Sequence, residues 1–189
     1  MCAWPPVETE PPTIHRHAPE PGEKLSSHYA ECFGCGPEQP GGLRIETEAA
    51  ENNMVRARFE VTKNHQGAPG LAHGGLLACA FDEALGVVVG QMLRRPAVTG
   101  RLETDFRRPV PVGSVLHIAA KVDGVAGRKI YASADGHLDA EDGPIAVQAR
   151  ALFISVGLDH FIKHGDADAL RKLGASMSER EREGWDVNP

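Results

Sequence analysis

A long apolar segment that begins at a pair of glycines constrains the fold of this chain most. The turn-rich stretch over residues 65–75 ends in His-Gly-Gly, and the apolar segment that follows carries only two acids, Asp82 and Glu83. We expect an almost wholly apolar helix over residues 74–92. Glycines let a ligand approach the unpaired N–H groups of a helix start, where the peptide dipoles add roughly half a positive charge. Such a helix start can hold an oxyanion.

Strand patterns lie on both sides of this helix. Apolar and polar residues alternate in residues 43–47 and 54–61, with a turn at Asn52-Asn53 between them. Four further strands are expected over residues 98–110, 115–122, 129–138 and 145–156, joined by turns rich in Gly and Asp. One helix between two groups of strands predicts the α+β class, with an antiparallel sheet wrapped around the helix.

The two ends of the chain differ from this central region. Residues 1–24 are rich in Pro, Glu and His, which predicts a flexible N-terminal arm. Residues 25–157 form the predicted domain, and its first part, 25–42, is expected to begin with a short helix and to end in turns. Residues 158–189 are expected to be a C-terminal helical extension, with short polar helices over 166–173 and 176–183. Ser176 and Ser178 are the expected caps.

Length and charge narrow the classes of protein. The 189 residues suffice for one core with tails, and the formal net charge of −6 argues against non-specific binding to nucleic acid. No apolar run is judged long enough to span a bilayer, and the N-terminus lacks the pattern of a signal peptide. We therefore expect a cytoplasmic protein with neither a nucleic-acid nor a membrane partner.

The cysteines are too few for a disulfide scaffold in a chain of this length. Cys79 lies in the apolar helix and is expected to be a small core residue. Cys32 and Cys35 form a C-x-x-C pattern with His28 four residues ahead, and Cys2 stands near the N-terminus. A zinc site usually needs four ligands, and no second Cys/His pair follows at a suitable spacing. We therefore favour local packing under a loop over a metal or redox role, and predict no metal.

The element order and three motifs resemble a known family. Two strands, a buried helix and four strands resemble the hotdog fold. The pattern H-x-G-x-P-G-x-x-H-G-G over residues 65–75, with Asp82 nine residues after the second His, resembles the PaaI-type acyl-CoA thioesterases. Residues 107–113, Arg-Arg-Pro-Val-Pro-Val-Gly, resemble a turn of the same group, and Thr99 stands where some members place a catalytic Thr. The resemblance covers roughly residues 40–157, and it implies an active site shared between two subunits.

Thioester hydrolysis needs an oxyanion donor, an activated water or nucleophile, and a hold on the acyl carrier. The N–H of Gly75, with that of Gly74, is the candidate donor; losing one such donor costs about 3–4 kcal/mol of transition-state stabilisation. Asp82 is the candidate base or nucleophile, because the motif register falls on it. Glu83 is the less favoured candidate, since adjacent helical residues point about 100° apart. The alternative for both acids is a satisfied polar residue at a dimer interface or cap.

The spacing of Gly75 and Asp82 predicts a homodimer. At about 1.5 Å per residue the two lie about 10 Å apart along the helix. One carbonyl carbon cannot lie within about 3 Å of a donor at Gly75 and also of the Asp82 carboxylate. Two copies related by a two-fold axis can bring Gly75 of one beside Asp82 of the other. A dimer of such dimers is a further possibility.

Other candidates each have an ordinary structural alternative. His73 either orients the substrate carbonyl or water, or caps the helix and fixes the turn. Thr99 either positions the attacking water or is an ordinary strand residue. His65 and Gln66 either shape the loop or contact the acyl group. Four basic residues could bind the phosphates of coenzyme A, or could simply be solubilising residues: Arg107, Arg108, Arg128 and Lys129.

The sequence thus predicts an acyl-CoA thioesterase without a cofactor. No Gly-x-Gly-x-x-Gly, P-loop or Gly-x-Ser-x-Gly pattern is present in the sequence. One alternative is a hotdog hydratase or dehydratase acting on acyl thioesters, for which the His-Gly-Gly motif fits less well. The other is a non-catalytic dimer that binds acyl-CoA.

Overall fold

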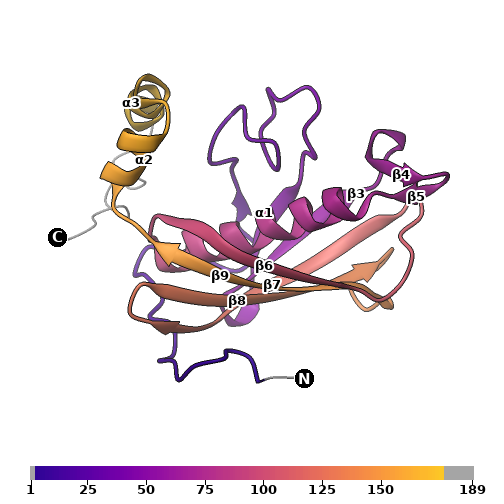
Figure 1. Ribbon diagram of the computed structural model, residues 1–189, viewed down its shortest axis with the longest axis horizontal. Coiled ribbons are helices and arrows are strands. Elements are labelled where there is room, and N and C mark those ends of the chain that lie inside the picture. The colour runs from indigo at the N-terminus through magenta and orange to yellow at the C-terminus, as the bar shows by residue number, and fades with distance from the viewer. Residues whose placement is uncertain (1–2, 177–189) are drawn as a thin grey trace.

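Helix α1 (Gly74–Leu93) lies across one face of a seven-stranded antiparallel sheet (Figure 1). The computed structural model describes residues 3–176. The strand order is β1-β2-β3-β7-β8-β9-β6, so β6 forms one edge of the sheet. This arrangement confirms the predicted α+β class.

The strands of the large sheet are β1 (Lys24–Leu25), β2 (Glu46–Ala50), β3 (Met54–Glu60), β6 (Ala97–Phe106), β7 (Val115–Ala126), β8 (Lys129–Leu138) and β9 (Ile145–Ser155). A small second sheet joins β4 (Gln66–Ala68) to β5 (Leu71–Ala72), and the 3-10 helices are η1 (Glu51–Asn53) and η2 (Lys63–His65). The last helices are α2 (Leu158–His164) and α3 (Ala167–Ser176).

Two predictions about the region before β3 were wrong. The expected short helix near residue 25 is absent, because Leu25 pairs with Thr47 in a strand ladder. The strand predicted over residues 43–47 begins only at Glu46. Leu43 and Ile45 are buried as predicted, but their N–H groups donate to the carbonyls of Phe33 and Gly34 in the preceding loop rather than to a strand.

The core lies between α1 and the sheet. The ring of Phe81 packs on Gly136 of β8, where an added Cβ would lie 2.5 Å from Cζ. By length and composition alone α1 could cross a membrane, with a mean hydropathy of 1.6. This corrects the expectation that no apolar run is long enough. Packing against the sheet explains the composition, since half of that window is buried inside the fold.

Residues 3–24 contact the sheet and the end of α1 at several points. Trp4 Nε1 donates to Asp123 Oδ2 at 2.9 Å, and Glu10 pairs with Val125 through two backbone hydrogen bonds. Ile14 and Ala18 pack against the core. These contacts attach a segment for which the sequence predicts flexibility. The domain boundaries at residues 24 and 157 stay predictions.

Helices α2 and α3 follow β9 and stand away from the sheet at one end (Figure 1). Helix α3 matches the helix predicted over 166–173, whereas α2 was not predicted. Ser176, expected as a cap at the start of the second predicted helix over 176–183, is instead the last residue of α3. The rest of that predicted helix and its proposed cap Ser178 lie outside the described residues.

Candidate active site

Asp82 and Thr99 meet between α1 and the edge strand β6. The Thr99 hydroxyl donates to Asp82 Oδ1 at 2.9 Å, which fixes one carboxylate oxygen. Burial raises the pKa of Asp82, and the hydrogen bond from Thr99 opposes part of that rise. The half-buried carboxylate therefore has a higher pKa than a surface aspartate, and is held in place by a neighbouring hydroxyl.

The start of α1 is capped by His73. The Gly75 N–H donates to His73 Nδ1 at 2.9 Å, and the N–H groups of Leu76 and Leu77 donate to the His73 carbonyl. His73 thus occupies the capping arrangement that the sequence left as one of two alternatives. The Gly75 N–H, expected to bind an oxyanion, has the exposed His73 ring as its partner in this conformation.

Gly75 and Asp82 do not meet within one chain. Both lie on the continuous helix α1, about 10 Å apart along its axis at ~1.5 Å per residue. Gly74 lies instead beside Phe106 at the far end of β6, where a Cβ on Gly74 would be 3.4 Å from the ring. Phe106 is 52% exposed, so the start of α1 is flanked by an open apolar surface.

His65 and Gln66 are both bonded within the loop that precedes α1. His65 is buried against Phe59, and its Nδ1 accepts from the Thr62 N–H at 3.0 Å. Burial lowers the pKa of His65. Gln66 Oε1 accepts from the Gly70 N–H at 2.8 Å. These contacts correspond to the loop-shaping alternative, and contact with an acyl group stays a prediction.

The four basic residues proposed for phosphate binding fall into two pairs. Arg107 donates its N–H to the carbonyl of Ala146, whereas Lys129 is paired with Ile154. From Ala146 to Ile154 strand β9 spans about 26 Å at ~3.3 Å per residue. Within one chain, the pair Arg107 and Arg108 therefore lies at the opposite end of the sheet from Arg128 and Lys129.

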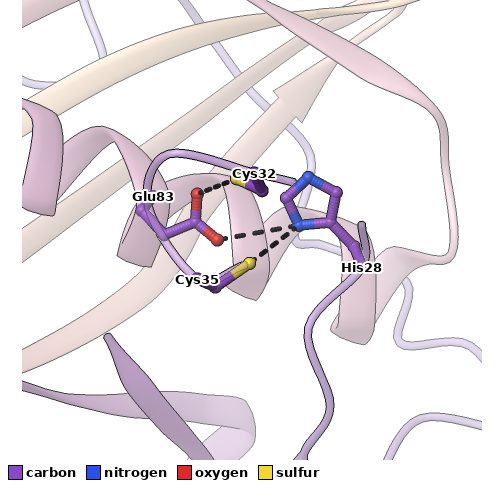
Figure 2. Close-up of side chains that lie close together, drawn as sticks. All are labelled: His28, Cys32, Cys35 and Glu83. Atoms are coloured by element: carbon purple, nitrogen blue, oxygen red, sulfur yellow. Dashed lines mark hydrogen bonds and ion pairs between the residues drawn. The ribbon is translucent and has the colours of Figure 1, made fainter. Parts of the chain in front are cut away.

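Glu83 lies in a cluster with His28, Cys32 and Cys35 (Figure 2). A hydrogen bond with Cys35 is the largest influence on Cys32 and, with one from His28, lowers the pKa of Cys32 to about 3. Burial raises the pKa of Glu83. The sequence showed the C-x-x-C pattern and His28, but no local signal could indicate that Glu83 joins them. Cys79 packs against the core, as predicted.

Comparisons with known proteins give a consistent result. The family model described as "Thioesterase superfamily" matches residues 69–142. The acyl-coenzyme A thioesterase THEM4 of Bos taurus is 36% identical over 137 residues, which cover 71% of this chain and 54% of the relative. With THEM4 of Xenopus laevis the share of the relative is 47%, so the chain spans about half the length of these two curated proteins.

Solved structures of other proteins are similar to this chain in fold. Protein RHA08564, a thioesterase superfamily protein, is 30% identical with a TM-score of 0.60, over 74% of this chain and 70% of that one. The E. coli PaaI protein is 19% identical with a TM-score of 0.55, over 61% of this chain and 81% of that one. Together they confirm the predicted hotdog fold.

Proposed function

Because the chain belongs to the thioesterase superfamily, we propose that it hydrolyses an acyl-CoA thioester at a site shared between two copies. The observation that carries the proposal is the half-buried Asp82 carboxylate, aligned by the Thr99 hydroxyl. The acyl-CoA substrate is supported by the relatives named acyl-coenzyme A thioesterases. The products are a free acid and coenzyme A.

Asp82 acts as the base or the nucleophile of this reaction. As a base it takes a proton from water through the oxygen that Thr99 leaves free, and the resulting hydroxide attacks the thioester carbonyl. The C–S bond then breaks and the thiolate leaves. A pKa raised by burial suits this role, because a general base works best when its pKa approaches the working pH. As a nucleophile, Asp82 attacks the carbonyl itself, the C–S bond breaks and the thiolate leaves, and water then hydrolyses the resulting anhydride.

The carbonyl oxygen binds at the N–H of Gly75 in the second copy, with the N–H of Gly74 beside it. The His73 ring, which accepts from Gly75 here, lies at the surface and can rotate away. The substrate oxygen then takes the place of Nδ1 on the same N–H. The helix dipole at this end stabilises the negative charge that develops on that oxygen.

The edge strand β6 is the proposed seam between the two copies. Its outer edge has no partner strand within the described chain, and open strand edges readily pair with another chain. Arg101 and Glu103 flank Leu102, so two antiparallel copies paired about Leu102 place opposite charges across the seam. This pairing brings the Phe106 end of one strand toward the Thr99 end of the other.

The same two-fold axis determines which basic residues lie near one active site and could bind coenzyme A. It brings Arg107 and Arg108 of one copy toward the end of the partner sheet that carries Arg128 and Lys129. Basic residues that are about 26 Å apart within one chain then flank one active site. We propose that residues of these pairs bind the phosphates of coenzyme A.

A thiol-release assay with a panel of acyl-CoAs tests the proposal. We expect wild-type protein to release free thiol, and Asp82→Asn to lower kcat at least about 100-fold. Asp123→Asn is the matched control, because Asp123 is also a partly buried aspartate that accepts from a hydroxyl, that of Ser133. The control should keep wild-type activity, since alternation along β8 places Ser133 on the opposite face from Gly136 and α1.

Other outcomes of the assay identify the alternatives. Binding of acyl-CoA without thiol release indicates a non-catalytic binding dimer. A change in the acyl chain without free thiol indicates a hydratase or dehydratase. Full activity in Asp82→Asn contradicts the assignment of Asp82.

A further inference from the structure

A second cluster of reactive side chains lies next to the proposed active site. The loop over residues 26–45, between β1 and β2, carries His28, Cys32 and Cys35 over α1, where they meet Glu83 (Figure 2). One potential ligand atom from each of the four side chains lies within 4.8 Å of the others. Two sulfurs and an imidazole nitrogen from the loop thus lie close to a carboxylate oxygen from α1.

Three separations within the cluster are close to the edge lengths of a coordination tetrahedron. Atoms bound to one tetrahedral zinc ion, with Zn–N and Zn–O near 2.0–2.1 Å and Zn–S near 2.3 Å, lie about 3.3–3.8 Å apart. Here Cys35 Sγ lies 3.3 Å from His28 Nδ1, and Cys32 Sγ lies 3.5 Å from Glu83 Oε2. Glu83 Oε1 lies 3.6 Å from His28 Nδ1. Glu83 thus turns Oε2 toward Cys32 and Oε1 toward His28, and all three separations suit atoms arranged around one metal ion.

Among the described residues, the contacts of Glu83 leave one oxygen of its carboxylate without a hydrogen bond. Its side chain is only 11% exposed, and its Oε1 atom is buried without a hydrogen bond. A carboxylate in this position is costly unless a cation or donors compensate it. The loop is built to reach it, because a Cβ on Gly34 would lie only 2.2 Å from Oε2. The bare backbone of Gly34 therefore allows the loop to close over the carboxylate.

We propose that His28, Cys32, Cys35 and Glu83 bind one zinc ion, which fastens this loop to α1. Thiolate and imidazole ligands favour zinc over the hard cations magnesium and calcium, and four protein ligands complete a structural site without a place for substrate. Both cysteines bind as thiolates, and any thiol proton still present is released to solvent on binding. The site lies one residue along α1 from Asp82, so the ion also steadies the helix turn that carries the proposed base.

Elemental analysis of the purified full chain tests the site without reference to activity. The protein is produced with zinc, freed of any affinity tag, kept reduced and dialysed. We expect close to one zinc ion per chain in the wild type. Cys32→Ser, Cys35→Ser and Glu83→Gln should each lower the zinc content severalfold. Cys79→Ser and Asp82→Asn are the matched controls and should retain it, because neither residue belongs to the cluster.

Cobalt provides a second readout. Protein stripped with a chelator and loaded with Co²⁺ should show the intense visible bands of tetrahedral cobalt, together with thiolate-to-cobalt charge transfer. Cys79→Ser should keep both signals, and Cys35→Ser should lose the sulfur contribution that Cys35 supplies.

The wild-type measurement alone can overturn the proposal, whether or not every variant folds. Zinc below about one tenth of an ion per chain after growth with zinc would do so. So would a Cys32–Cys35 disulfide in freshly prepared protein that carries no zinc, since the pair would then be redox-active. Because the inference does not rest on the proposed thioesterase activity, an Asp82→Asn protein that keeps zinc but loses hydrolysis separates the two.

Discussion

Asp82 and Glu83 are neighbours in sequence with different surroundings. Asp82 accepts from the Thr99 hydroxyl, whereas Glu83 faces His28 and Cys32. Helical geometry turns adjacent side chains about 100° apart, so the two acids cannot serve one reacting atom. At the scale of the residue, two opposing influences act on the pKa of Asp82. Burial raises it, and the hydrogen bond from Thr99 lowers it.

Replacement of Thr99 should shift the pH dependence of hydrolysis. A base works when deprotonated, so kcat/KM falls as the pH drops through the pKa of Asp82. The hydrogen bond from Thr99 lowers this pKa, so Thr99→Val should move the acidic limb of the profile to higher pH. Thr104→Val, on the same strand, should leave the limb in place. An unmoved limb in Thr99→Val contradicts the proposed partnership.

Replacement of His73 should affect stability more than chemistry. His73→Ala removes the side-chain acceptor of the Gly75 N–H, and loss of a helix cap typically costs about 1 kcal/mol of unfolding free energy. Because the N–H itself remains, we expect kcat to stay within a few-fold of wild type. Urea denaturation and steady-state kinetics measure the two effects. A fall in kcat of about 100-fold or more would show that His73 acts on the substrate instead.

The residues of the candidate site could be predicted in part. The motif singles out Asp82, Gly75, His73 and Thr99, and the structure brings Asp82 to Thr99 and His73 to Gly75. The partners of Glu83 could not be predicted, because His28 and Cys32 reach it from a loop whose path depends on the whole fold. A search for paired Cys/His motifs overlooks a carboxylate from a distant helix as the fourth ligand.

At the scale of the element, the packing of α1 depends on close contact with β8. The Phe81 ring fills the space above Gly136, where an added Cβ would lie 2.5 Å from Cζ. We expect Gly136→Ala to lower the unfolding free energy by about 1–3 kcal/mol, the usual cost of overpacking. Gly90, inside α1, offers open space instead: beyond the backbone of its own helix, an added Cβ would meet no heavy atom within 4 Å.

Gly90→Ala, on the same helix but outside its contact with β8, is therefore the matched control. It should raise the unfolding free energy by about 0.5–1 kcal/mol, because alanine favours the helix over glycine. Urea denaturation of both variants checks the pair. A loss of stability in Gly90→Ala would show that another surface packs on this residue in the assembled protein.

Helices and strands could be predicted from sequence where the apolar pattern matches the backbone hydrogen bonds that the segment forms in the structure. Strand β8 has the predicted limits, and α1 differs by one residue at its end. Strand β2 begins late because Leu43 and Ile45 bond to the loop at Phe33 and Gly34, which alternation cannot reveal. Strands as short as β1 and β5 carry too few residues for any period to be recognised.

At the scale of the whole molecule, one chain holds the two halves of the proposed site at opposite ends of β6. Asp82 and Thr99 lie at one end of β6, and Gly74 and Phe106 lie at the other. The distance between Gly75 and Asp82 follows from helix geometry alone, so the need for a second copy could be argued from sequence. The side chains that would meet across the proposed seam could not be predicted, since they depend on how the sheets of two copies pair.

Mixing two inactive variants tests the shared site. Asp82→Asn removes the base, and Gly75→Pro removes the N–H donor at a first-turn position where proline is tolerated. In a mixed dimer, one site then carries both lesions and the other carries neither. Random exchange of equal amounts yields about half mixed dimers with one working site of two, so thiol release should recover to roughly a quarter of wild type.

The choice of partner variant provides the control. Asp82 and Thr99 lie in the same chain, so a mixture of Asp82→Asn with Thr99→Val creates no site that has both residues. It should show no more activity than the average of the two unmixed variants. Native mass spectrometry verifies that mixed dimers have formed in both mixtures. If the Asp82→Asn and Gly75→Pro mixture stays inactive although its mixed dimers are present, the donor and the base do not come from different copies. Light scattering at assay concentration tests the same point. A protein that is monomeric there and still fully active leads to the same conclusion, because each chain would then have to bring its own Gly75 and Asp82 together across about 10 Å of rigid helix.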